Sequence, residues 1–132
     1  MIKILIDRSM EGPASILWGM LCVEGWVTFF PLKLKALVEV GLPETASDQE
    51  VWRFAQNHQM ILLTGSRSLE SGDVLENLIR QEHTSSAWPV LTITQLNLIT
   101  TDRNYQELCL DRLLEILENI NSYKGKGRIF LP

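Results

Sequence analysis

Residues 3 to 7 read Lys3-Ile4-Leu5-Ile6-Asp7, a short apolar run that ends in an acid. The run does not alternate between apolar and polar side chains, which is typical of a strand buried on both faces of a parallel sheet. The carboxyl ends of neighbouring parallel strands meet at one edge of the sheet, where α/β proteins bind their ligands. We therefore expect a central strand over 3–6, with Asp7 at a candidate site.

Downstream of Asp7 the sequence alternates between helical and strand patterns. Gly12-Pro13 and Gly25 bound a helix whose apolar stripe consists of Ile16, Leu17, Met20, Leu21 and Val23. The aromatic and β-branched run over 26–30, which ends at Pro31, predicts the second strand. The remaining expected strands are 60–64, 90–94 and 128–131, and the remaining helices are a short one over 34–38 closed by Gly41, then 47–58, 73–79 and 110–120. This alternation predicts an α/β fold with a mainly parallel sheet.

Composition indicates one domain over residues 1–132, because 45% of the chain is apolar and no repeat or linker divides it. The net charge of -4 and the pI near 5.1 argue against a protein whose whole surface binds nucleic acid. A local basic patch remains compatible with this charge. Lys124, Lys126 and Arg128 alternate near the end of the chain, where they either contact RNA or only keep the tail soluble.

The two cysteines, Cys22 and Cys109, lie in apolar helical contexts and lack metal-type spacing, so we expect both to be reduced core residues. The apolar run at the start of the sequence meets a charge, that of Asp7, too early to be a secretory signal. Glu24 interrupts the longest apolar stretch before it reaches the length needed to cross a bilayer. The sequence therefore predicts a cytoplasmic protein with no membrane partner.

Three short motifs together resemble the small bacterial PIN-like proteins, whose name refers to the PilT N-terminus. They are the strand that ends in Asp7, the helix start Ser47-Asp48-Gln49-Glu50, and the strand and turn over 61–66. The PIN-like pattern has an Asp two residues after the Thr that ends the third strand, and here that position is Ser66. The resemblance spans about residues 3 to 79 and implies a three-layer α/β/α sandwich.

Active PIN-like proteins are ribonucleases that depend on Mg or Mn, and many are toxins of toxin-antitoxin pairs. The resemblance therefore implies RNA cleavage by a metal-activated water, as a toxin or an RNA-processing factor. It assigns Asp7, Asp48 and Glu50 as catalytic metal ligands. Asp73, or else Glu70, would replace the acid missing at Ser66, and Ser66 and Arg67 would contact the substrate phosphate.

The alternative that the resemblance implies is a PIN-like scaffold that has lost its metal, because Ser66 is a weak, neutral ligand. Such a scaffold would bind RNA, an antitoxin, another protein or a second copy of itself.

Each candidate residue also has a purely structural interpretation. Asp7 and Ser66 could be turn residues, and Arg67 a surface residue. Glu50 completes a capping box with Ser47, while Asp48 could favour the helix dipole. Asp73 follows Gly72 and precedes Glu76, as a helix cap would.

Other chemistries lack their sequence patterns. No Gly-rich phosphate loop follows a strand, and no Gly-x-Ser-x-Gly nucleophile elbow occurs. His58 and His83 stand at helix ends, where interaction with carbonyl groups or solvent accounts for them. The four tryptophans are dispersed along the chain, which indicates packing rather than a platform for bases.

Overall fold

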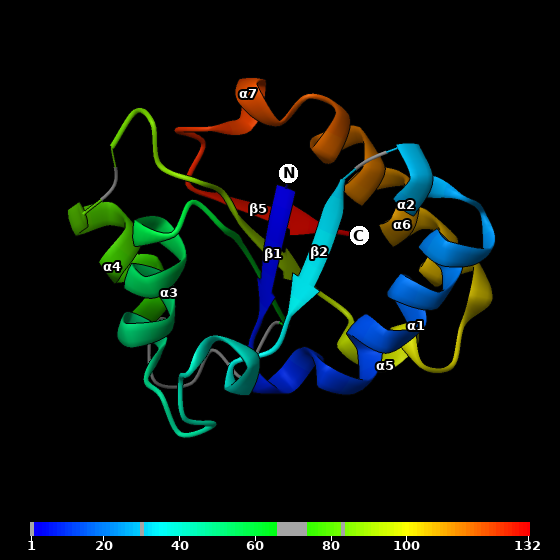
Figure 1. The fold of residues 1–132 in the computed structure, drawn as a ribbon, viewed down its shortest axis with the longest axis horizontal. Coiled ribbons are helices and arrows are strands. Elements are labelled where there is room, and N and C mark those ends of the chain that lie inside the picture. The colour runs from blue at the N-terminus through cyan, green and yellow to red at the C-terminus, as the bar shows by residue number, and fades with distance from the viewer. Residues whose placement is uncertain (1, 30, 66–73, 83) are drawn as a thin grey trace.

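The fold is a three-layer α/β/α sandwich around a five-stranded parallel sheet (Figure 1). The computed structural model describes residues 2–29, 31–65, 74–82 and 84–132. The strands stand in the order β2-β1-β3-β4-β5. They are β1 (Ile2–Ile6), β2 (Leu32–Lys35), β3 (Ile61–Gly65), β4 (Val90–Ile93) and β5 (Arg128–Leu131).

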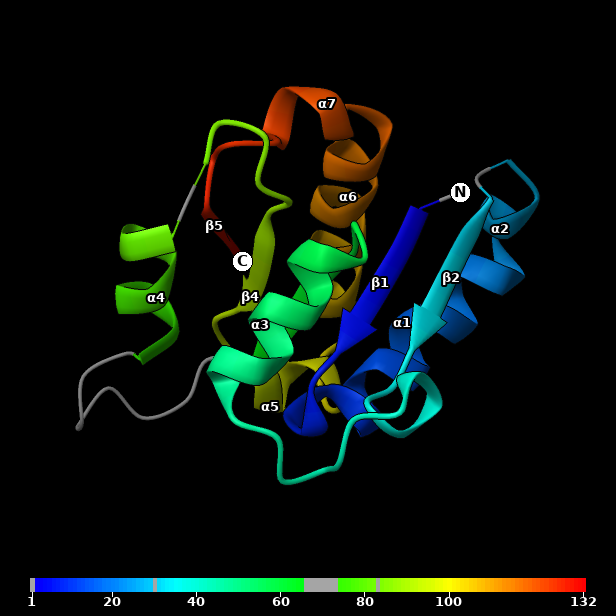
Figure 2. The ribbon, with the colours of Figure 1, turned by 60° about the vertical axis from the view of Figure 1, so that its left-hand side comes forward.

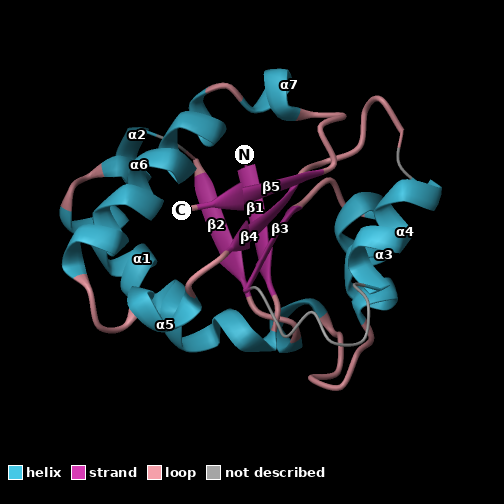
Figure 3. Ribbon diagram, turned by 180° about the vertical axis from the view of Figure 1, so that it is seen from behind, coloured by secondary structure: helices cyan, strands magenta, loops and turns pink. Residues whose placement is uncertain are grey.

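Helices cover both faces of this sheet (Figures 1 and 3). The α-helices are α1 (Glu11–Val23), α2 (Trp26–Phe29), α3 (Asp48–Asn57), α4 (Val74–Glu82), α5 (Leu96–Ile99), α6 (Arg103–Glu118) and α7 (Ile120–Tyr123), and the 3-10 turns are η1 (Arg8–Met10) and η2 (Val38–Val40). The α/β class with a parallel sheet, predicted from the alternation of patterns, is confirmed.

Alternate residues of the strands build two separate cores. Ile4 and Ile6 pack with α1, α5 and α6 on one side of the sheet, which we call the α1/α6 face. Leu5 and Leu62 pack with α3 and α4 on the other side, the α3/α4 face. The burial of both faces explains why the run Ile4-Leu5-Ile6 in β1 is uninterrupted apolar sequence instead of alternating.

The connection from β4 to β5 has the opposite hand to the connection from β1 to β2. α1 leads to β2 at one edge of the sheet, and α6 leads to β5 at the other edge. Both helices nevertheless pack on the same face, so the two crossovers cannot share a hand. Because almost all such crossovers are right-handed, this arrangement is uncommon. It leaves Phe130, which points away from the α1/α6 face, 55% exposed.

The second strand is not where the sequence predicted it. Residues 26–29 form α2, because Gly25 adopts a φ of 78° after α1 and its carbonyl accepts a hydrogen bond from the Thr28 amide (3.1 Å). The strand β2 instead follows Pro31, and Leu34, expected in a short helix, pairs with Ile4 of β1. The short helix itself is the 3-10 turn η2, which ends at Gly41 with a φ of 86° as expected.

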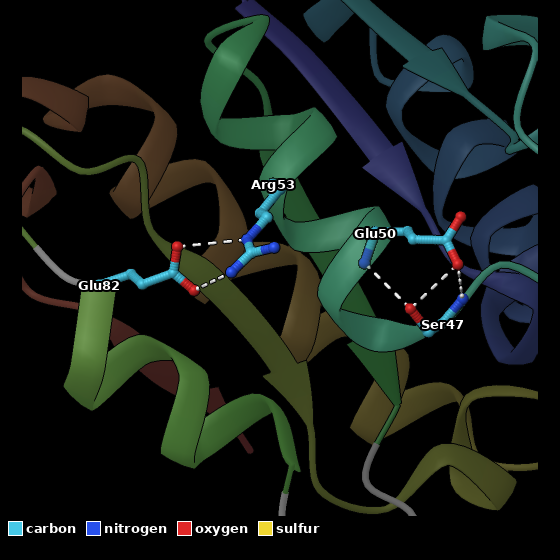
Figure 4. Close-up of polar contacts among 4 residues, drawn as sticks. All are labelled: Ser47, Glu50, Arg53 and Glu82. Carbon is cyan, nitrogen blue, oxygen red and sulfur yellow. Dashed lines mark hydrogen bonds and ion pairs between the residues drawn. The ribbon is translucent and has the colours of Figure 1, made fainter.

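The helix predicted after Ser47 is confirmed, together with its capping box (Figure 4). Ser47 Oγ accepts a hydrogen bond from the Glu50 amide (3.2 Å), and Glu50 Oε1 accepts from the Ser47 amide (3.4 Å). At the outer surface of α3, the Arg53 guanidinium binds both carboxylate oxygens of Glu82 in α4, at 3.2 and 2.8 Å. This bidentate pair links the two helices of the α3/α4 face.

The close approach of Gly125 to the chain before β4 gives a prediction about stability. A Cβ at Gly125 would lie 2.4 Å from the Ser85 carbonyl oxygen, whereas a Cβ at Gly25 would meet nothing within 4 Å, although both glycines have a positive φ. We expect Gly25→Ala to lower the free energy of unfolding by about 1 to 2 kcal/mol through its φ alone. Gly125→Ala should lower it by about 1 to 3 kcal/mol more, because of the overlap.

Urea unfolding of the two variants measures this difference. Equal losses in Gly25→Ala and Gly125→Ala would contradict the close packing of the segment before β5 against residue 85.

Candidate functional site

The carboxyl ends of β1 and β3 form the point where the chain reverses its direction across the sheet. α1 leads from β1 to β2 on one face, and α3 leads from β2 back across β1 to β3 on the other. The two connections therefore diverge between β1 and β3. In doubly wound folds, ligands bind at such a switch point.

Asp7 lies at this switch point, buried to 5% exposure. Its Oδ1 accepts hydrogen bonds from the Ser9 amide (3.0 Å) and from Ser9 Oγ (2.5 Å). Its Oδ2 accepts a short hydrogen bond from Thr64 Oγ1 at the end of β3. The Asp7 carboxyl group therefore connects the turn after β1 to the neighbouring strand.

Ser9 and Gly65 extend this network of hydrogen bonds. Ser9 Oγ, which donates to Asp7, accepts a hydrogen bond from the Gly65 amide (3.3 Å). A Cβ at Gly65 would stand 3.2 Å from Ser9 Oγ and 2.5 Å from Leu96 Cδ2 of α5. A glycine at this position therefore lets the chain pass between the hydroxyl group and the apolar side chain.

The sequence did not identify Ser9 and Thr64 as residues of the site. The spacing Asp7-x-Ser9 was an available signal, because an Asp side chain commonly accepts a hydrogen bond from the amide two residues on. The partnership with Thr64 spans 57 residues and becomes visible only once β1 and β3 pair.

The two acids of the α3 start differ in their surroundings. This helix begins at the same edge of the sheet as the turn that follows β1 (Figure 2). Glu50 is exposed, and its carboxylate folds back onto Ser47, as the capping-box interpretation requires. Asp48 is half-buried in the first turn and does not belong to the capping box.

The other predicted site residues, Ser66, Arg67 and Asp73, lie outside the residues that the structure describes, as does Glu70. Among the described residues, no group of three or more His, Cys, Asp or Glu side chains is close enough together to hold a metal ion. The side chains of Ser9 and Thr64 that bind Asp7 carry hydroxyl oxygen atoms, and oxygen is the ligand type that Mg and Mn prefer.

Tyr105 and Cys109 of α6 close the same edge of the sheet beyond β4 and β5. Tyr105 Oη accepts a hydrogen bond from the Gln95 amide (3.1 Å), and Cys109 Sγ lies 3.7 Å from the carbonyl oxygen of Pro132. Burial raises the pKa of both Tyr105 and Cys109. The expectation that both cysteines are core residues is confirmed for Cys109 and wrong for Cys22, which lies on the outer side of α1.

Comparisons of the chain with models of protein families, with curated proteins and with solved structures find no match. Within the described part of the chain, no helix has both the length and the apolar character needed to span a bilayer.

The hydrogen bond between Thr64 and Asp7 yields a prediction about the stability of the site. Thr64→Val keeps the shape of the side chain and removes the donor, so the buried Asp7 carboxyl group loses a partner. We expect the free energy of unfolding to fall by about 1 to 3 kcal/mol, the usual effect of leaving a buried polar group without its partner.

Thr100→Val is the matched control, because the exposed Thr100 hydroxyl donates only to the Asn97 carbonyl oxygen. Its effect on urea unfolding should stay within about 0.5 kcal/mol. Equal effects of the two variants would mean that the Thr64 hydroxyl group does not support Asp7.

The raised pKa of Cys109 predicts a loss of stability in alkaline solution. The unfolded chain releases the thiol proton near pH 8.5, whereas the folded protein holds it to higher pH. The stabilising contribution of this group is therefore complete below the unfolded pKa, and it is lost as the pH rises toward the folded pKa. Urea unfolding between about pH 7.5 and 9.5 should show the decline.

Cys109→Ala should flatten this pH dependence, whatever its effect on absolute stability. Cys22→Ala, which removes the exposed thiol on the outer side of α1, is the matched control. An unchanged slope in Cys109→Ala would contradict the prediction.

Proposed function

We propose that the protein is a PIN-like ribonuclease that hydrolyses RNA phosphodiesters with Mg or Mn. The observation that carries the proposal is the position of Asp7, a buried acid at the switch point of a parallel sheet. Hydrogen bonds from Ser9 and Thr64 offset the cost of burying this carboxyl group, and the edge of the sheet where it lies is the one at which parallel α/β folds bind ligands. The toxin and RNA-processing roles are both compatible with this chemistry.

In this proposal Asp7 and Asp48 are the described residues that would hold the ion. Ser9 and Thr64 fix the orientation of the Asp7 carboxyl group through their hydrogen bonds. Glu50 is the weaker candidate, because its carboxylate would have to leave the capping box. The ion, when bound, would supply an activated water and neutralise charge on the phosphoryl oxygens.

The third acid and the phosphate contact would come from the segment after β3. Asp73 would complete the ligand set, and Ser66 and Arg67 would bind the substrate phosphate. A guanidinium group suits that role because it binds phosphate oxygens in a bidentate manner.

A second candidate function is a PIN-like scaffold without metal, which acts by binding RNA or a protein. The observation that favours it is that groups of the protein itself donate hydrogen bonds to the carboxylates of Asp7 and Glu50. Both oxygens of Asp7 accept hydrogen bonds from protein groups, and Glu50 is held in the capping box. In this alternative the Asp7 network has a structural role, and the site has too little negative charge to hold a divalent ion.

Cleavage of single-stranded RNA in the presence of Mn tests the proposal. The native chain should cleave the RNA, and Asp7→Asn and Asp48→Asn should each reduce the rate by at least about a hundredfold if the ion requires both carboxylates. Asp102→Asn is the matched control, because Asp102 caps α6 and asparagine is an equally good cap.

The melting temperature in a Mn titration provides a second measurement, since a ligand that binds only the native state raises stability. An absence of both cleavage and metal-dependent stabilisation would reject the nuclease and leave the scaffold. Cleavage that persists in Asp7→Asn would instead show that the activity does not belong to this site.

A further inference from the structure

A groove of about 720 Å³ runs between α1 and α6 on the outer surface of the α1/α6 face. Residues one helical turn apart on α1, including Ile16, Gly19, Met20 and Val23, form one wall, and Leu110 of α6 contributes to the other. These side chains are mainly apolar. The groove thus combines apolar and charged side chains between two helices.

Val23 is the most exposed apolar side chain that lines this groove. The sequence placed Val23 in the core-facing stripe of the helix, but its side chain is 88% exposed, while Leu17 and Leu21 are buried. Gly19 stands one turn earlier, and a Cβ added there would meet nothing within 4 Å. An exposed apolar side chain beside an open glycine leaves space for a partner to approach the helix backbone closely.

The charges at the groove are predominantly acidic. Its lining contains the carboxylates Glu24, Glu107 and Asp111 and a single guanidinium group, that of Arg103. Arg103 pairs with Glu107 within α6 at 3.3 Å, so this cation is offset by a neighbour. The sequence of α1 contains no Lys or Arg. A partner with apolar and basic side chains would therefore match both the apolar residues of the groove and the carboxylates Glu24 and Asp111 at its margin.

We propose that this groove binds an amphipathic helix of another protein, with the helix's apolar side chains against Val23 and Leu110 and its Lys or Arg side chains near Glu24 and Asp111. A helix in an apolar groove is a common mode of peptide recognition. A second copy of this chain is a poorer match, because its net charge of -4 would oppose the acidic margin. The proposal does not depend on the metal site.

Fluorescence anisotropy with a synthetic peptide tests this surface on the full chain. The probe has about 18 residues, roughly five helical turns, with Leu on one face and Lys on the other. It should bind saturably, and binding should weaken as salt increases, because surface charges are screened. A peptide with Glu in place of Lys should bind at least about tenfold more weakly, the effect of like charges at an interface.

Two variants locate the binding on the groove. Val23→Lys places a charge on the apolar side of α1 that lines the groove and should weaken peptide binding about tenfold or more. Asp111→Lys reverses a charge at the margin and should weaken binding and reduce its salt dependence. The matched control is Val38→Lys, because Val38 is 59% exposed on η2, away from the groove, and the variant should bind like the native chain.

Three results would overturn the proposal. One is an absence of saturable binding, and another is equal weakening in Val23→Lys and Val38→Lys, which would mean nonspecific attraction to an acidic protein. The third comes from light scattering after gel filtration. If the native chain assembles with itself and Val23→Lys makes it monomeric, the occupant is a second copy and not another protein.

Discussion

The Asp7 carboxyl group is the constraint on which the central part of the fold depends. It is buried where β1 ends, and its oxygens accept hydrogen bonds from Ser9 in the following turn and from Thr64 at the end of β3. A buried acid without such partners would destabilise the native state, so its position requires the turn to fold back and β3 to lie alongside. The apolar ladder between β1 and β3 and this polar contact therefore specify the same register.

The course of the last crossover accounts for the surface of the molecule. Because α6 packs on the same face as α1, the two helices lie side by side and create the groove that contains Val23. A connection of the usual hand would have placed α6 over the opposite face. The same topology leaves Phe130 of β5 55% exposed. The exposure of this apolar side chain is thus a consequence of the hand of the last crossover.

Local patterns predicted the elements that local interactions determine. The buried runs of β1 and β3 and the capping box of α3 are encoded by adjacent residues, and the structure contains all three. The aromatic run over 26–30 was misleading, because a short apolar segment fits a strand or a helical turn equally well. Gly25 favours the helical turn over 26–29, and the Leu-Lys alternation after Pro31 suits an edge strand.

Features that depend on distant residues could not be predicted in this way. The exposure of Val23 and Cys22 follows from which side of α1 faces the sheet, because Ala14, Leu17 and Leu21 occupy the buried side. The sequence predicted no helix between the strand over 90–94 and the helix over 110–120, yet this part of the chain contains α5, whose Leu96 lies next to Gly65. For the site, the sequence supplied Asp7 and Asp48. Its spacing from Asp7 was an available signal for the donor Ser9, whereas the donor Thr64 required the folded arrangement.

The arrangement of donors also explains why one site admits both functional interpretations. Glu50 stabilises the start of α3 through its capping box, an interaction worth about 0.5 to 2 kcal/mol, so recruiting it to an ion would sacrifice part of that stability. Asp48 has no role in the capping box, so an ion held by Asp48 would leave that cap intact. Asp7, in turn, is stabilised by Ser9 and Thr64 whether or not an ion is bound. Loss of the metal would therefore leave the fold intact, and a scaffold could evolve from a nuclease without rebuilding its core.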